Sequence, residues 1–222
     1  MKPIDLAVLR DVLLLSFAAG SADAAGWMGL GRVFTANMTG NVVLLGMFLG
    51  QGQFATAARS VFVLVLFMFG VAAGTRLDRG VAPKDWPRLA RRIITVEKVS
   101  LILFALAWTL ALHRGAAADY GLLALLGFAM GMQSAAMSRL GAPGVGTTAL
   151  TSTVTTFVTG VVTRATDPVA GPRVSFAFPG GVLALYGLGA ACAGLLIATV
   201  PWLAGWLPIA AALWVWPRPP AA

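Results

Sequence analysis

The sequence predicts an all-α fold: a polytopic helical membrane protein with six crossing helices, two short polar re-entrant or broken segments, and a twofold internal repeat. Composition is the first observation, because 59% of the 222 residues are apolar, only 11% are charged, and the mean hydropathy is +0.85. One soluble core could not hide this much apolar surface. The other two observations are a series of eight apolar runs and a polar pattern that occurs twice.

Turns rich in glycine and proline divide the chain into eight helical segments. These segments span residues 7–28, 33–50, 57–75, 93–112, 121–138, 147–163, 177–198 and 200–217. Two of them, 33–50 and 147–163, are rich in threonine and, at about 17 or 18 residues, are barely long enough to cross a hydrocarbon layer of about 30 Å. The other six are predicted to cross the membrane.

Lysine and arginine positions favour six crossings with both termini inside. If the two polar segments dip in and return on one side, twelve of the 16 basic residues are cytoplasmic and only Arg32, Arg59 and Arg114 face outward. Eight crossings with the N-terminus outside would also keep residues 76–92 inside, but with a poorer separation of charge. We therefore expect a multi-pass membrane protein, with residues 76–92 and both termini cytoplasmic.

The two halves of the chain resemble each other. FAAGSADAA at 17–25 aligns with FAMGMQSAA at 128–136, and TANMTGN then aligns with TTALTST. The alignment pairs Gly20 with Gly131, Asp23 with Ser134, Thr35 with Thr147, Thr39 with Thr151, and Asn41 with Thr153. The halves would be about 7–112 and 121–217, inverted if each crosses three times and parallel if each crosses four times. Chance similarity between small-residue membrane segments is the alternative.

The same residues resemble a known family. GSADAAGWMGLGRVFTANMTGNVVLLG and AMGMQSAAMSRLGAPGVGTTALTSTVT are similar to the YoaK-like family of bacterial inner-membrane proteins, a domain of unknown function usually drawn with six transmembrane helices. The resemblance covers nearly the whole chain and implies a fold and a location, but no established activity. The second motif departs from the family pattern, since Gln133-Ser134 stands where Gln-Asn is expected, which weakens any role for an amide at position 134.

The first polar segment offers hydrogen-bonding side chains for a solute path. If residues 35–41 are helical, Asn37 and Asn41 share one face, and Thr35 and Thr39 share another. Amides and hydroxyls can replace the water shell of a small ion or polar solute, and a broken helix adds free backbone groups. Alternatively, the threonines bond back to the carbonyl four residues earlier and help helices pack. That alternative is weaker for the asparagines, whose amides are costlier to bury.

The second half supplies the remaining candidate path residues. A stripe of threonines lies at a spacing of four residues, and a glutamine and a serine lie on the preceding helix. These residues are Thr147, Thr151, Thr155, Gln133 and Ser134. Pairs of glycines four residues apart, such as Gly70 and Gly74, favour close helix packing.

Three carboxylates lie within apolar runs, where an acid is a functional candidate by default. Asp11 follows Arg10, which predicts an interfacial ion pair. Glu97 precedes Lys98, and an ion pair, snorkelling or a relay are all open. Asp23 has no cation near it in sequence, so it is the best single candidate to bind or couple a cation.

Other classes of function find little support in the sequence. It has no G-x-S-x-G, H-E-x-x-H or P-loop motif, and its single histidine and single cysteine, His113 and Cys192, cannot form a metal cluster. We expect no enzyme activity, cofactor, metal or nucleic-acid partner. The expected partners are the lipid bilayer and a small solute or ion, and a homo-oligomer is left open. The alternative function is a non-transporting membrane protein that packs with or regulates a partner.

Overall fold

Nine helices make up most of the part of the chain that the structure, a computed structural model, describes: residues 6–77, 86–110, 115–139, 150–166 and 177–215. The helices are α1 (Leu6–Gly29), α2 (Met38–Gly50), α3 (Phe54–Leu77), α4 (Trp86–Leu110), α5 (Ala116–Arg139), α6 (Leu150–Thr166), α7 (Ala177–Thr199), α8 (Pro201–Ala204) and α9 (Leu207–Leu213). Five of them, α1, α3, α4, α5 and α7, are long and apolar enough to cross a membrane. The predicted all-α membrane fold is confirmed.

The eighth predicted segment, 200–217, is two short helices rather than one. Pro201 and Pro208 lie in the first turns of α8 and α9, where proline is tolerated because no intrahelical N–H bond is needed. Between them Gly205 lies so close to the indole ring of Trp108 that a Cβ would be 2.5 Å from its Cγ. The break between α8 and α9 therefore lies where Trp108 of α4 packs against Gly205.

The second predicted segment becomes helical only at Met38. Gly31 and Arg32 have φ values of 92° and 62°, in the left-handed region, and turn the chain after α1. The Asn37 side chain then caps α2, because its oxygen accepts a hydrogen bond from the Gly40 N–H at 3.1 Å. The prediction that Thr35 and Asn37 lie on helix faces is wrong, since both precede the helix.

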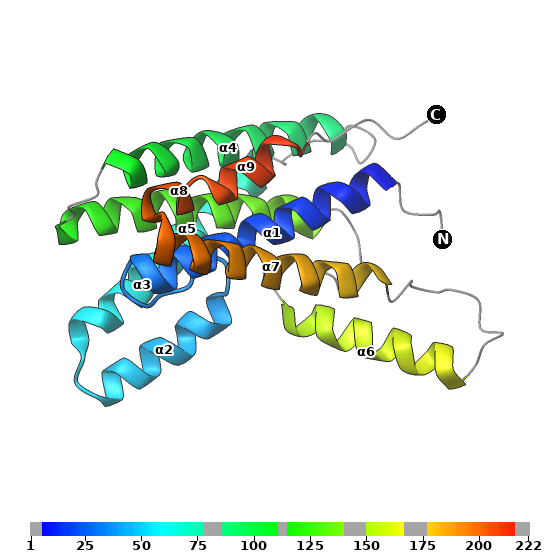
Figure 1. Cartoon of the computed structure of the whole chain (residues 1–222), viewed down its shortest axis with the longest axis horizontal. Helices are drawn as coiled ribbons and strands as arrows, with labels where there is room; N and C mark the ends of the chain where they lie inside the picture. The colour runs from blue at the N-terminus through cyan, green and yellow to red at the C-terminus, as the bar shows by residue number, and fades with distance from the viewer. Residues whose placement is uncertain (1–5, 78–85, 111–114, 140–149, 167–176, 216–222) are drawn as a thin grey trace.

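The long helices run along the longest axis of the molecule, whereas α2 and α6 do not extend from end to end (Figure 1). Each begins near the middle of that axis, and the two run to opposite ends. α2 ends close to the start of α3, near one end of the molecule (Figure 1). That these two segments enter and return on one side of the membrane stays a prediction.

The helix contacts occur in equivalent pairs. α1 packs along α7 and α5 packs along α3, while α2 lies on α3 and α6 lies on α7. In the same way α9 packs on α1 and α4 packs on α5. Helices that occupy the same place in the two halves, such as α1 and α5, run in opposite directions (Figure 1). These are the contacts that an inverted repeat would produce.

Glycines let the two main helix pairs touch backbone to backbone. At the first helix crossing, where α1 passes α7, Gly20 of α1 lies against the Tyr186 backbone. A Cβ added to Gly20 would be 3.0 Å from the Tyr186 Cα. Reciprocally, a Cβ at Gly189 of α7 would be 3.1 Å from the Phe17 Cα. No larger residue fits at either glycine without moving a helix.

The second helix crossing, where α5 passes α3, has the same geometry. Gly131 lies against the Phe67 backbone and Gly70 against the Phe128 backbone, with a Cβ at either glycine 3.0 Å from the Cα of the other. Both crossings thus join two copies of an aromatic residue followed three positions later by glycine. The packing role predicted for Gly70 is confirmed.

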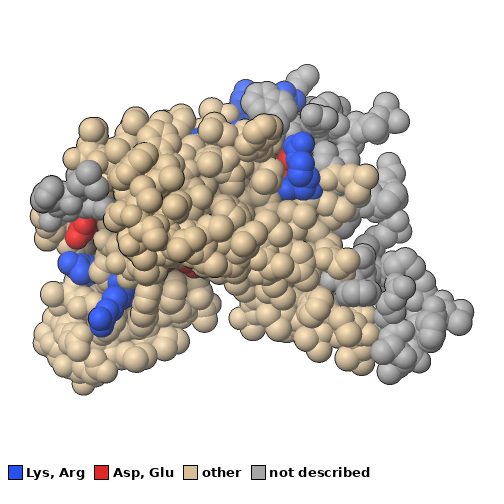
Figure 2. Space-filling view, in the orientation of Figure 1, with Lys and Arg blue, Asp and Glu red and all other residues tan. Residues whose placement is uncertain are grey.

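The surface matches a bundle surrounded by lipid. Large aliphatic side chains are exposed on α2, α3, α6 and α7, among them Val43, Met68, Val158 and Leu195. Most charged surface of the described residues lies in two groups, separated by a wide band that is uncharged except for a small acidic area (Figure 2). An uncharged band flanked by charge is what a hydrocarbon layer between two aqueous faces requires.

Candidate functional site

Asp23 lies on the buried side of α1, and its carboxylate accepts hydrogen bonds from three consecutive backbone N–H groups. The Thr35 and Ala36 nitrogens each lie 2.6 Å from Oδ1, and the Asn37 nitrogen lies 3.1 Å from Oδ2. The residue is only 3% exposed. Backbone donors converge on an anion in this way in anion-binding nests, and such charge-assisted bonds are among the strongest in proteins. The carboxylate therefore holds the segment between α1 and α2 in place.

Tyr186 completes the site from α7. Its phenol donates a hydrogen bond to Asp23 Oδ2, so the two helices that cross at Gly20 are also joined by polar groups. Sequence reasoning missed Tyr186. The available signal was weak, since it is one of only two tyrosines and lies in an otherwise apolar run.

The asparagines of the first polar segment are engaged by the chain itself. Asn41 is fully buried, accepts from the Phe34 N–H at 2.9 Å and donates to the Phe34 carbonyl at 2.5 Å. This two-way bond ties α2 to the segment before it, and Phe34 also stacks on Trp27 with ring centroids 5.0 Å apart. Asn37 caps α2, as described above. Both amides thus fix the local shape.

Asp23, Thr35, Asn37 and Tyr186 form a polar cluster at the N-terminus of α2. The positive end of the α2 dipole and the converging N–H groups offset the negative charge of Asp23. A carboxylate with neighbouring hydroxyl and amide oxygens is also a ligand set suited to a cation or a hydrogen-bonding solute. Figure 2 shows a hollow between the parts of the molecule formed by α2 and α6, with acidic surface at its inner end. The cluster thus combines a structural anchor with groups able to bind a solute.

The remaining predicted site residues do not share one environment. Gln133 of α5 is buried and donates from Nε2 to the Leu15 carbonyl of α1 at 3.0 Å, whereas Thr39 is exposed. Thr151 and Thr155 are exposed on α6, and Thr155 bonds back to the Thr151 carbonyl at 3.1 Å. Ser134 is half-buried on α5, and Thr147 lies outside the described residues. Among the described hydrogen bonds, none joins these residues to the Asp23 cluster.

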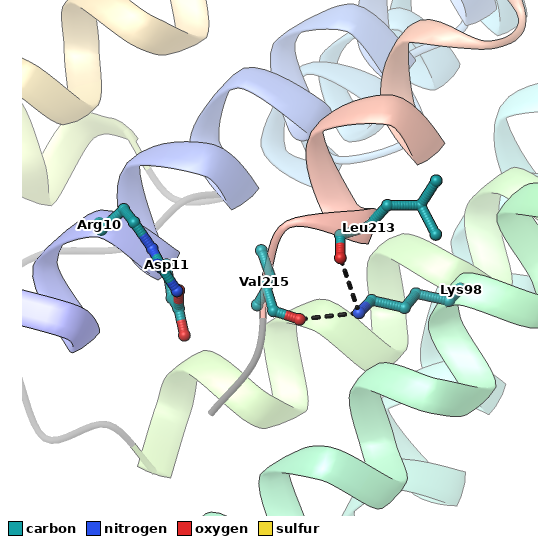
Figure 3. A network of polar contacts seen from close by, with 5 residues as sticks. All are labelled: Arg10, Asp11, Lys98, Leu213 and Val215. Carbon is teal, nitrogen blue, oxygen red and sulfur yellow. Dashed lines mark hydrogen bonds and ion pairs between the residues drawn. The ribbon is translucent and has the colours of Figure 1, made fainter. Parts of the chain in front are cut away.

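The other two intramembrane acids have different surroundings. Asp11 pairs with Arg10, whose guanidinium lies 2.6 Å from the carboxylate, which confirms the predicted ion pair. Lys98 extends from α4 to the end of α9, where its Nζ donates to the Val215 carbonyl at 2.7 Å and the Leu213 carbonyl at 3.4 Å (Figure 3). A cation at the carbonyl end of a helix is favourable. Glu97 is fully buried beside it.

Comparison with known proteins identifies the family. A family model described as "Protein of unknown function (DUF1275)" matches residues 12–216. The UPF0700 transmembrane protein YoaK of Bacillus subtilis (strain 168) is 35% identical over 150 residues, which cover 67% of this chain and 65%, just under two thirds, of that relative. No solved structure matches. The expected family resemblance is therefore confirmed, and the chain belongs to the DUF1275 family of transmembrane proteins that includes YoaK-like proteins.

Proposed function

We propose that this protein is a transporter or channel-like protein for a small polar solute or ion, and that Asp23 binds or couples a cation. One observation carries the proposal: the buried carboxylate of Asp23, on the apolar helix α1, lies at the N-terminal end of the half-length helix α2. Ionisable side chains within membrane spans are costly, and they commonly mark the paths of ions or solutes. The N-terminal ends of interrupted helices often contact substrate in secondary transporters.

The equivalent helix pairs support the same proposal. We propose that residues 7–112 and 121–217 are inverted copies, as in many secondary transporters, with the path between them lined by residues 35–41 and 147–156. Tyr186 of one half bonds to Asp23 of the other. Relative movement of the halves would break that bond, so solute binding at Asp23 and helix movement would be linked.

Charge distribution supports a location and an orientation. We place the protein in the cell inner membrane with both termini in the cytoplasm, because this arrangement puts most lysines and arginines on the inner side. Among the described residues, Arg10 and Arg76 would then lie near the cytoplasmic face, and Arg32 and Arg59 near the opposite face.

A second candidate is a membrane protein that does not transport but packs with or regulates a partner. The internal bonds of Asn41 to Phe34 and of Thr155 to Thr151 favour it, because these polar groups are already used within the chain. We favour transport because an ionisable side chain within a membrane span is costly and commonly marks the path of an ion or solute.

Reconstitution of the purified full chain into liposomes tests the proposal. A panel of inorganic ions and small polar metabolites should include at least one that enters faster than into empty liposomes. Asn37→Ala should lower its flux more than it lowers protein yield, whereas Val43→Ala, at an exposed position on α2, should leave flux unchanged. If no solute crosses faster with folded, inserted protein than without it, transport is contradicted and the packing role is favoured.

A further inference from the structure

Glu97 is the intramembrane acid that the Asp23 site does not use. It lies in the apolar part of α4, between the buried residues Ile94 and Leu101, and none of its surface is exposed. Neither carboxylate oxygen has a hydrogen-bond partner among the described residues. Asp23, by contrast, receives bonds from three N–H groups and a phenol. The two buried acids thus differ in their hydrogen bonding: Asp23 has several donors and Glu97 has none among the described residues.

Lys98 does not supply the missing partner. Adjacent residues on a helix point in different directions, and Lys98 reaches away to the carbonyls of Leu213 and Val215 at the end of α9 (Figure 3). On α1, Asp11 is paired with Arg10, whose guanidinium lies 2.6 Å from the carboxylate (Figure 3). The lysine therefore holds α9 while the acid beside it has no bonded donor.

Few other charged groups lie on the helices that pack against α4. The described residues of α8 and α9 include no titratable side chain. On α5 and α3 the titratable residues lie toward the helix ends, away from the middle of each helix. They are Asp119, Tyr120 and Arg139 on α5, and Arg59 and Arg76 on α3. Among the side chains that the structure describes on these helices, none is placed to compensate a negative charge in the middle of α4.

The form of Glu97 that fits this position is the neutral acid. A buried carboxylate without donors loses its hydration and gains no replacement, at a cost of several kcal/mol. Protonation removes the charge, and the acid O–H can then act as a donor itself. We propose that Glu97 is a proton-binding site in the membrane interior of this protein. Resting on the transport function proposed above, the coupled ion is then the proton.

Labelling with a hydrophobic carbodiimide tests the site directly in the full chain in liposomes. A protonated carboxyl adds across one C=N bond of the reagent, its proton goes to nitrogen, and no group leaves, so the adduct has the mass of the protein plus one reagent molecule. We expect the adduct at Glu97, with less of it as the pH is raised. Glu97→Gln should abolish the adduct, and Asp23→Asn should retain it. An adduct confined to Asp23 would overturn the proposal.

Infrared spectroscopy decides the case in which the reagent does not reach the site. At neutral pH the wild type should show a carboxylic-acid C=O band that is lost in Glu97→Gln. Loss of carboxylate bands instead would show that Glu97 is ionised and would overturn the proposal. A protonated Glu97 in liposomes without any flux would contradict transport but not the proton site. Flux insensitive to a pH gradient and to Glu97→Gln would contradict coupling but not transport.

Discussion

The two helix crossings, α1 with α7 and α5 with α3, use the same packing but carry different chemistry. In both, an aromatic residue is followed three positions later by a glycine on each helix, and each glycine lies against the opposite backbone. The first crossing adds Asp23 and Tyr186, whereas Ser134 and Phe67 occupy the aligned positions of the second. The glycines therefore define a scaffold that is used twice, and the acid and phenol define a site that is present once.

The differences at the two crossings occur together for a physical reason. A buried acid needs donors, and a phenol held against it needs an acceptor. Loss of Asp23 leaves the Tyr186 phenol without its acceptor, and loss of Tyr186 leaves Asp23 with its three backbone donors alone. Serine and phenylalanine make no such demand on each other. The pair Asp23 and Tyr186 is thus a unit, and its members should be changed singly and together to measure it.

The largest expected effect is disruption of either crossing. Gly20→Leu and Gly131→Leu should each destabilise the folded protein by more than about 3 kcal/mol, because the new side chain meets backbone that cannot move without separating two helices. Thermal unfolding in detergent measures the loss. Gly46→Leu, at a position with nothing within 4 Å of an added Cβ, is the matched control. Equal stability of Gly20→Leu and Gly46→Leu would contradict the scaffold role.

Removing the acid should affect one crossing much more than the other. Asp23→Ala leaves three backbone N–H groups and the Tyr186 phenol without their acceptor and should cost roughly 3 kcal/mol. Ser134→Ala at the aligned position should cost less than about 1 kcal/mol. The comparison of unfolding temperatures checks both values. Similar losses for the two variants would mean that the crossings differ less than their chemistry suggests.

The phenol should contribute less than the acid. Tyr186→Phe removes one hydrogen bond to a charged group and should cost about 2 kcal/mol, whereas Phe67→Tyr should give no gain. In a double-mutant cycle most of the Tyr186 effect should vanish when Asp23 is already alanine. Additive effects of the two substitutions would show that Tyr186 stabilises the bundle by packing alone.

The smallest effect is expected on α6. Thr155 is exposed, and among the described residues it bonds only to the Thr151 carbonyl of its own helix. Thr155→Val should therefore change the free energy of unfolding by less than about 0.5 kcal/mol. Heat stability of the purified variant measures this. A large loss would indicate that this threonine has a structural partner beyond its own helix.

Local patterns explain what the sequence could predict. Apolar runs located the helices, the unusual acid located Asp23, and adjacency located the pair Arg10 and Asp11. Tyr186 was missed because it lies 163 residues from Asp23 and only folding brings them together. The interruption at Gly205 likewise depends on Trp108 of another helix.

The start of α2 shows a second limit of sequence reasoning. The pattern of residues 35–41 fits two helix faces, but the Asp23 carboxylate captures the backbone N–H groups of Thr35, Ala36 and Asn37. Those groups are thereby bonded outside any helix, and the helix begins at Met38. Periodicity reports side chains and cannot report such a competition for backbone donors.

The most direct test of the central claim compares solute flux through two matched variants in liposomes. Asp23→Asn keeps the shape of the side chain and one acceptor oxygen but removes the charge, and Ser134→Ala alters the aligned position. We predict that Asp23→Asn abolishes the flux seen with the wild type while the protein stays folded and inserted, and that Ser134→Ala retains it. Full flux through Asp23→Asn would contradict the claim that the acid-bearing crossing is the functional one.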